Sequence, residues 1–205
     1  MSQDKRQEES AGDEQRLVRL AQSGDSQAFG RLYQRYIDRV YSFVLFRVRD
    51  PQLAEDLTQE VFIQTLRGLE SFDWRGSMAP WILRIARNTV VDHWRRSARR
   101  AEQPWSAVEP GDTDDESSRI ESVAEEMERS EMARAEMALD RERVSLAAEQ
   151  LTELQQQVLA LRFAAGLSIR ETAEVMSRSE GAIKNLQHHA LRGLRRALLQ
   201  SGEAE

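Results

Sequence analysis

Helical spacing of the apolar residues is the feature that most restricts what this chain can fold into. Over residues 15–100 and 151–199 the apolar side chains recur every three or four positions. Val, Ile and Thr never alternate with polar residues over a strand-length run. Only ten Gly and four Pro interrupt the 205 residues, whereas the helix formers Ala, Leu, Glu, Arg and Gln recur throughout. We therefore expect an all-α fold.

Composition divides the chain into two small helical domains joined by an acidic linker. Residues 1–14 are polar and are expected to be disordered, and residues 15–100 form the first domain. Residues 101–144 contain Pro, Gly and a run of acids, which is typical of a linker, and their Ala-, Glu- and Met-rich second half favours partial helix. Residues 145–199 form the second domain, and residues 200–205 form a tail.

What the sequence lacks excludes several classes of function. The absence of Cys removes disulfides, thiolate nucleophiles and thiolate zinc sites. There is no HExxH pattern, and the consecutive His188 and His189 point about 100° apart on a helix. We therefore expect neither a metal site, nor a cofactor, nor a hydrolase. The longest apolar stretches, such as Val40–Val48, are too short to cross a bilayer. The N-terminus has no apolar segment behind its charges, so we expect a cytoplasmic protein without membrane insertion.

The net charge of −6 hides a separation of charge along the chain. Residues 26–100 hold 13 Lys and Arg against 8 Asp and Glu, whereas residues 101–150 hold 5 against 15. A basic block beside an acidic one is compatible with a protein that binds a polyanion. One hypothesis is that the acidic segment competes with phosphates for the basic faces of the free protein. The alternative is that it is only a soluble spacer.

Residues 166–197 have the pattern of a helix-turn-helix. Ser168 is placed to cap a first helix, and Glu171, three residues later, completes a capping box. That helix is expected to end near Met176, and Ser177–Ser179 form the turn before a second helix begins near Glu180. The second helix of such a motif lies in the major groove of DNA.

The two faces of this second helix differ in chemistry. An apolar stripe is expected to face inward: Ile183, Leu186, Ala190, Leu194 and Ala197. The opposite face carries groups suited to base edges and phosphates: Asn185, His188, Arg192 and Arg196, flanked by Lys184, His189 and Arg195. The alternative is a solvated face on a small helical bundle.

A basic helix is expected to begin at Pro80, where the missing N–H of proline is tolerated. Its apolar side consists of Ile82, Leu83, Ala86, Thr89, Val90, His93 and Trp94. Its other side is lined by Arg84, Asn88, Val91 and Arg95, with Asp92 and Arg96 at the edge. The loop before this helix holds Phe72 and Trp74 beside Arg75, and aromatic side chains next to a basic helix can stack on unpaired bases. The alternative is that the two aromatics fill the core beneath the loop.

A narrow polar stripe is expected on a third helix, over residues 53–67. It consists of Asp56, Gln59, Glu60 and Ile63, between two apolar sides. An exposed Ile among acids indicates a contact with another protein, although a solvated stripe is the default interpretation.

Together these motifs carry a family resemblance. Ala54–Phe62 resembles the segment with which sigma-70 family proteins dock on the clamp helices of the RNA polymerase β′ subunit. Trp81–Asn88 resembles the helix that reads the minus-ten promoter element, and Phe72–Arg75 falls where the family has its strand-opening loop. Gly166–Lys184 resembles the family's minus-thirty-five reader. Two such blocks without the central domain of housekeeping sigma factors resemble the extracytoplasmic-function (ECF) group.

The resemblance implies an ECF sigma factor that binds core RNA polymerase and directs promoter recognition and transcription initiation. Residues 15–100 would be sigma-70 region 2 and residues 145–199 region 4. Implied partners are the β′ clamp helices, the β flap, promoter DNA and an anti-sigma factor, with no cofactor and no enzymatic activity. The family's linkers are thought to run near the path of the RNA, so docking on the polymerase would draw the acidic linker away from the DNA-reading faces.

Three sets of residues follow from the resemblance. Those for core polymerase are Glu55, Asp56, Gln59, Glu60 and Ile63. Those for the minus-ten element are Phe72, Asp73, Trp74, Arg75, Arg84, Arg87, Asn88, Val91, Asp92, Arg95 and Arg96. Those for the minus-thirty-five element are Ser179, Glu180, Gly181, Ala182, Lys184, Asn185, His188 and Arg192. A one-component helix-turn-helix repressor is the alternative, but it explains only the second domain.

Overall fold

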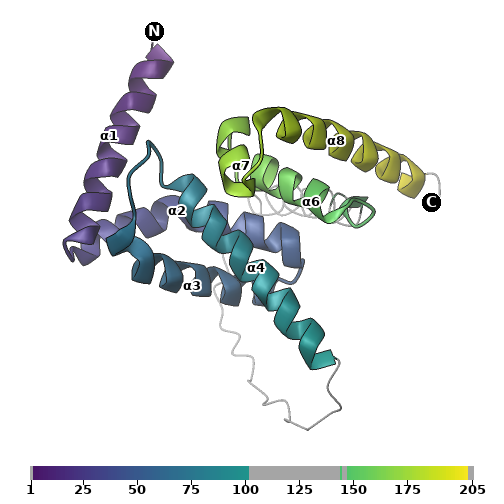
Figure 1. The fold of residues 1–205 in the computed structure, drawn as a ribbon, viewed down its shortest axis with the longest axis horizontal. Helices are drawn as coiled ribbons and strands as arrows, with labels where there is room; N and C mark the ends of the chain where they lie inside the picture. Colours follow the sequence, from purple (N-terminus) through teal and green to yellow (C-terminus); the bar gives the residue numbers. More distant parts are fainter. Residues whose placement is uncertain (1, 102–143, 145–146, 203–205) are drawn as a thin grey trace, which may run out of the picture.

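The computed structural model describes residues 2–101, 144 and 147–202, and it is all-α in these parts of the chain (Figure 1). A first unit contains α1 (Ser2–Gln22), α2 (Ser26–Val48), α3 (Pro51–Gly68), the short η1 (Leu69–Ser71) and α4 (Ala79–Ala101). A second unit contains α6 (Glu153–Leu159), η2 (Ala160–Ala164), α7 (Ile169–Met176) and α8 (Glu180–Gly202). The predicted all-α class and the predicted helix-turn-helix are confirmed. The predicted linker lies almost entirely outside the described residues.

Local capping explains where the helices of the first unit begin. Asp25 caps α2, since its carboxylate accepts hydrogen bonds from the amides of Gln27 (2.9 Å) and Ala28 (3.1 Å). Asp50 caps α3 in the same way through the amide of Leu53 at 3.1 Å, and Pro51 occupies the first turn. The Asp50-Pro51 junction is therefore a helix boundary.

Helix α1 differs from the predicted disordered segment over residues 1–14. It begins at Ser2 and runs to Gln22, and within the predicted segment Glu14 is buried with 5% of its surface exposed. Leu17 and Val18 on the same helix are also buried. Because the partners of Glu14 lie on α2 and just before α4, its burial depends on tertiary contacts. The polarity of residues 1–14 does not reveal such contacts.

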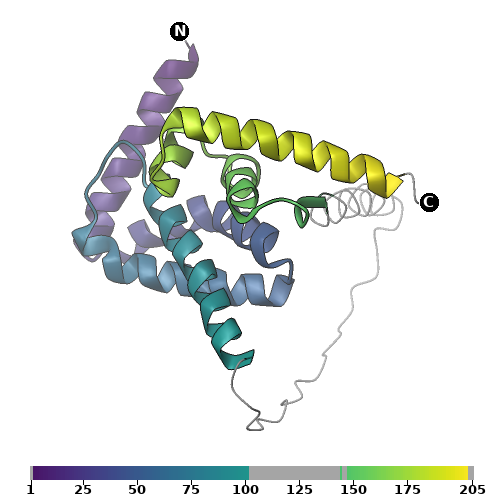
Figure 2. The ribbon, with the colours of Figure 1, turned by 45° about the vertical axis from the view of Figure 1, so that its right-hand side comes forward.

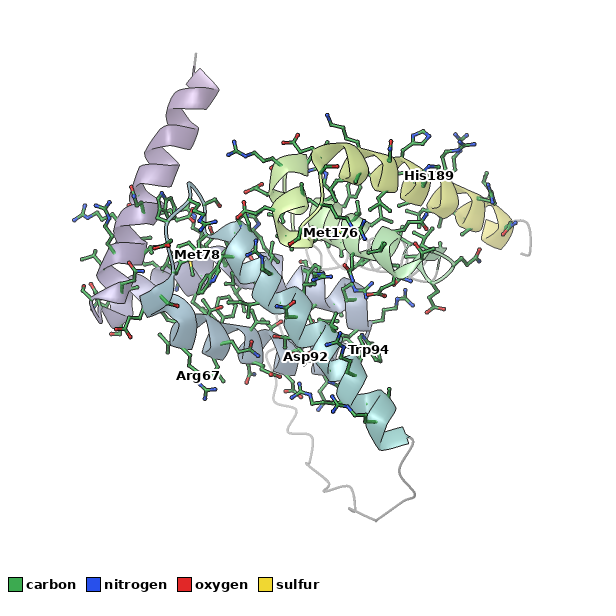
Figure 3. All side chains as sticks on the ribbon, viewed as in Figure 1. Arg67, Met78, Asp92, Trp94, Met176 and His189 are labelled. Atoms are coloured by element: carbon green, nitrogen blue, oxygen red, sulfur yellow. The ribbon has the colours of Figure 1, made fainter. Side chains whose placement is uncertain are left out.

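The core of the first unit lies between α2, α3 and α4. Val40 and Val44 of α2, Val61 of α3 and Leu83 of α4 are among its fully buried side chains. The predicted apolar side of α4 is confirmed as far as Val90, but His93 is only half-buried and Trp94 is 45% exposed. The last turns of α4 extend beyond the core, as Figure 3 shows for Asp92 and Trp94 on the half of α4 farther from α7.

The two units pack against each other, α7 against α4 and η2 against α2 (Figure 2). A single apolar cluster crosses this contact, since buried Leu161, Val175 and Met176 of the second unit join the core of the first. Within the described residues, no helix combines the length and the apolar composition that crossing a membrane requires.

We expect Ser168→Ala to lower the free energy of unfolding by about 1 kcal/mol, because it removes the N-cap of α7. The hydroxyl of Ser168 accepts a hydrogen bond from the amide of Glu171 at 3.2 Å, and the Glu171 carboxylate accepts one from the amide of Ser168 at 2.8 Å. Urea unfolding followed by circular dichroism measures the loss. Gln52→Ala, an exposed change in the first turn of α3, is the control, and equal stability of both variants would contradict the capping argument.

Candidate nucleic-acid interface

The helix-turn-helix in the second unit has the local geometry that its sequence predicts. Ser168 and Glu171 form a capping box at the start of α7. Ser177 ends α7 in the left-handed conformation at φ 53°, and Ser179 then caps α8 by accepting a hydrogen bond from the amide of Ala182 at 3.2 Å. The turn therefore lies at the predicted Ser177–Ser179, and α8 begins at Glu180.

Helix α8 separates an apolar from a polar face as predicted. Ile183, Ala190 and Ala197 are buried, and Leu186 and Leu194 pack against the core. The predicted minus-thirty-five residues are exposed, apart from the half-buried Ala182. His189 also lies on the outer side of α8 (Figure 3). The face that a major groove would receive is thus free in this arrangement.

Arg162 is a residue of this interface that the sequence reasoning missed. Its Nε donates to the side-chain oxygen of Gln187 on α8 at 2.9 Å, and its guanidinium also donates to the carbonyl of Leu167. One side chain therefore ties α8 to the residue before the α7 cap. No local signal predicts this bridge, because Gln187 lies 25 residues further along the chain.

The basic helix α4 is partly covered by the second unit. Asn88, Asp92, Arg95 and Arg96 are exposed. Arg84 and Arg87, in contrast, are half-buried. Arg84 donates to the carbonyl of Glu174 at 3.1 Å, and Arg87 donates to the side-chain oxygen of Gln157 at 3.0 Å. Two of the predicted minus-ten arginines are therefore bound within the protein in this arrangement.

The two aromatic side chains of the loop between η1 and α4 differ in burial. Phe72 is buried and packs on Trp81 with ring centroids 4.6 Å apart, and on the edge of Trp74 at 6.5 Å. In this arrangement Phe72 fills the core beneath the loop, as in the alternative interpretation. Trp74 is half-buried, and Asp73 and Arg75 are exposed, so these three remain available for the predicted DNA contact.

The polar stripe on α3 is at the surface. Glu55, Asp56 and Gln59 are exposed, and Ile63 keeps 50% of its surface accessible. Glu60 is half-buried, lies 3.6 Å from the guanidinium of Arg96 and accepts a hydrogen bond from Gln64. The sequence reasoning missed Leu66, which is 55% exposed and lies three residues after Ile63 on the same side. An apolar pair thus extends the stripe.

Arg39 and Arg47 of α2, like Arg84 and Arg87 of α4, donate hydrogen bonds to the second unit. Arg39 donates to the carbonyls of Ala165 (2.7 Å) and Gly166 (3.3 Å). Arg47, whose side chain is 4% exposed, donates to Gln156 at 3.0 Å and pairs with Glu153. Burial raises the pKa of the Glu153 carboxyl, but hydrogen bonds from Arg47 and Gln157 outweigh it and lower the pKa below its ordinary value.

Comparison with protein families gives two matches, one for each unit. Residues 32–100 match the family described as Sigma-70 region 2, and residues 147–196 match Sigma-70, region 4. The matched segments include the α3 stripe, α4, its preceding loop and the helix-turn-helix.

Individual proteins similar to this chain carry related descriptions. The ECF RNA polymerase sigma factor BldN of Streptomyces coelicolor is 41% identical over 89% of this chain, which spans 64% of that protein's length. The ECF RNA polymerase sigma factor SigX of Bacillus subtilis is 33% identical over 83% of each chain. The sigma factor RpoE from Bartonella quintana, solved with the anti-sigma factor NepR, has a similar fold, with a TM-score of 0.60 at 18% identity over 83% of this chain and 96% of that one.

We expect acid to loosen the contact between the two units. A carboxyl whose pKa is lowered in the folded state stabilises that state above its ordinary pKa, and the stabilisation is lost as the pH falls through the lowered value. Energy transfer between dyes placed on the two units should therefore decrease as the pH falls below the ordinary Glu pKa of about 4.3 and through the lowered pKa of Glu153. Glu153→Gln should remove part of this dependence, and an unchanged profile in that variant would contradict the role of the Arg47–Glu153 pair.

Proposed function

This chain belongs to the sigma-70 family as an RNA polymerase sigma factor of the ECF group, and we propose which of its surfaces binds the polymerase and which surfaces read the promoter. It binds core RNA polymerase in the cytoplasm through the α3 stripe, reads the minus-ten element through α4 and its loop, and reads the minus-thirty-five element through α8. The observation that carries this proposal is the exposed polar face of α8, set on a capped helix-turn-helix in a chain that also carries the basic helix α4.

The α3 stripe suits a protein surface better than DNA. It combines exposed carboxylates at Glu55 and Asp56 with exposed apolar side chains at Ile63 and Leu66. Carboxylates repel phosphates, whereas an apolar pair framed by charge is typical of a protein contact. The β′ clamp helices are the partner proposed for this stripe, and the β flap is the partner proposed for the second unit.

The α4 surface suits DNA because its exposed end is basic. Arg95 and Arg96 provide cations for phosphates, and Asn88 provides an amide for base edges. Trp74 and Arg75 lie on the adjacent loop, where an aromatic ring can stack on an unpaired base. We propose that these residues, and not the buried Phe72, contact the opened strand.

The packed arrangement does not suit simultaneous reading of both promoter elements. Sites centred about 25 base pairs apart lie about 85 Å apart along B-DNA at about 3.4 Å per pair. Helices of 23 residues such as α4 and α8 are about 34 Å long, and α7 touches both of them. The two units therefore separate on the promoter, and separation also releases Arg84 and Arg87. The segment 102–143 is long enough to allow it, because an extended chain spans about 3.3 Å per residue.

A one-component repressor is disfavoured as the function of this chain. It would need the helix-turn-helix alone, whereas the family matches cover both units. The relatives are described as sigma factors, so we propose no catalytic activity. An anti-sigma factor, the kind of partner named with the RpoE structure, is the regulator proposed for this chain.

Run-off transcription with core polymerase on genomic fragments tests the proposed function. We expect the wild-type chain to give discrete transcripts, and Asp56→Lys to weaken binding to core polymerase about tenfold, since one charge reversal at an interface changes the binding free energy by about 1.4 kcal/mol or more. Asp38→Lys, the same charge reversal at an exposed position of α2 outside the stripe, is the matched control. Unchanged affinity of Asp56→Lys would contradict the stripe, and absence of any transcript would contradict the function.

Holding the two units together should block transcription but not polymerase binding. Arg49 pairs with Glu149 across the contact, and the chain contains no Cys, so the variant Arg49→Cys/Glu149→Cys offers two unique thiols. Bridging them with a short reducible bismaleimide should lower run-off transcription at least about tenfold, and reductant should restore it. Each single Cys variant treated with the reagent is a control. Full activity of the bridged protein would show that separation is not needed.

A further inference from the structure

The loop before α4 is held at both of its ends by one helix, α1. This loop, residues 72–78, runs from η1 to α4 and carries Asp73, Trp74 and Arg75. Figures 1 and 2 both draw it alongside α1. Two α1 side chains, Glu14 and Gln22, contact the two ends of the loop. The function proposed for the chain assigns no role to these two residues.

Gln22 holds the entry to the loop. Its side-chain amide donates to the carbonyl of Leu69 at 3.0 Å and to the carbonyl of Phe72 at 2.8 Å. Both hydrogens of one amide group are thus used on the two carbonyls that flank the step from η1 into the loop. A glutamine that satisfies two backbone carbonyls at once fixes the direction in which the chain leaves the helix.

Glu14 holds the exit from the loop. Its carboxylate accepts hydrogen bonds from the amide of Met78 at 2.8 Å and from the hydroxyl of Tyr36 at 2.5 Å, and Arg35 lies 3.6 Å from its second oxygen. Glu14, Tyr36 and Met78 are all buried. Burial and the neighbouring carboxylate raise the pKa of Tyr36, so its hydroxyl stays neutral and donates. A buried carboxylate is stable only when it is paired and hydrogen-bonded, and here a backbone amide of the loop is one of its partners.

The spacing of the two side chains sets the span of the loop. Glu14 and Gln22 are eight positions apart on a helix, which corresponds to about 12 Å along its axis. Between the two anchors the chain passes through Gly76, whose φ of +95° is accessible to glycine and not to most other residues. The anchors are buried or half-buried, whereas Asp73 and Arg75 are exposed. The two anchors thus hold a short segment of the loop in which Asp73 and Arg75 are exposed.

We propose that Glu14 and Gln22 are positioning residues for promoter opening: from α1 they hold the loop so that Trp74 and Arg75 are presented to the opened strand. This inference rests on the proposed function. Neither residue contacts DNA. A group that captures a transient unpaired base must be held within about 0.5 Å of its working position. Glu14 and Gln22 hold the loop, which has no regular secondary structure of its own, in this way.

The primary test uses Gln22→Glu, which keeps the size of the side chain but replaces its donors with an acceptor. Gln34→Glu, the same change at an exposed position of α2, is the matched control. On a duplex promoter that the wild-type holoenzyme transcribes, we expect open-complex formation by Gln22→Glu to slow about tenfold, since the hydrogen bonds to the carbonyls of Leu69 and Phe72 at the entry to the loop are lost. On the same promoter with a pre-opened bubble, the rate should stay within about twofold of wild type. Trp74→Ala should likewise slow open-complex formation on the duplex promoter and leave the rate on the bubble promoter nearly unchanged.

Several outcomes would overturn the inference. If Trp74→Ala is slow on the duplex alone and Gln22→Glu behaves like wild type on the duplex, α1 does not position the loop. If Gln22→Glu is equally slow on duplex and bubble and melts at lower temperature, its role is only structural. Glu14→Gln, which keeps an acceptor for the Met78 amide but loses the charge, should give a smaller duplex defect than Gln22→Glu.

A readout that does not involve transcription separates this inference from the proposed function. Amide hydrogen exchange in the full chain should rise over residues 73–78 in Gln22→Glu and remain as in wild type over α7 and α8. If the wild-type chain gives no transcript, the proposed function fails while this measurement still decides whether α1 fixes the loop. Unchanged exchange over residues 73–78 overturns the positioning role.

Discussion

The buried guanidinium of Arg47 is the constraint on which the arrangement of the two units depends. A cation removed from water must be paired and hydrogen-bonded, because an unpaired buried charge is strongly destabilising. The acceptors available to Arg47 are Glu153 and Gln156, both on α6. Besides this side-chain link from α2 to α6, η2 packs along α2 and α7 packs on α4. The positions of Arg39, Arg84 and Arg87, each donating to the second unit, are consistent with this single placement.

The same contact links folding to promoter recognition. Arg84 and Arg87 belong to the helix proposed to read the minus-ten element, yet in the packed arrangement they bind Glu174 and Gln157. Exposed ion pairs contribute little, and a buried ion pair is offset by its desolvation cost, so most of the stability of the contact comes from its buried apolar side chains.

A second buried charge, Glu14, fixes the other working part of the first unit. Its carboxylate joins α1, α2 and the start of α4 through the Tyr36 hydroxyl and the Met78 amide. The loop between η1 and α4 is therefore part of a rigid frame, and Phe72 and Trp81 fill the space beneath it. Burial of Phe72 leaves Trp74 as the aromatic side chain of the loop that remains partly accessible. This packing therefore decides that Phe72 belongs to the core and that Trp74 lies at the surface.

Local chemistry in the sequence determined the helices, their caps and the faces of the helix-turn-helix. The capping box of Ser168 and Glu171 and the buried stripe from Ile183 to Ala197 depend on residues a few positions apart, so helical periodicity is sufficient to predict them. Only the tertiary structure decided that Phe72 is buried, that Arg84 and Arg87 are covered, and that Arg162 holds α8 through Gln187. The burial of Glu14 likewise depends on Met78, 64 positions away. Contacts at such separations leave no periodic trace in the sequence, because they arise only after the helices have packed.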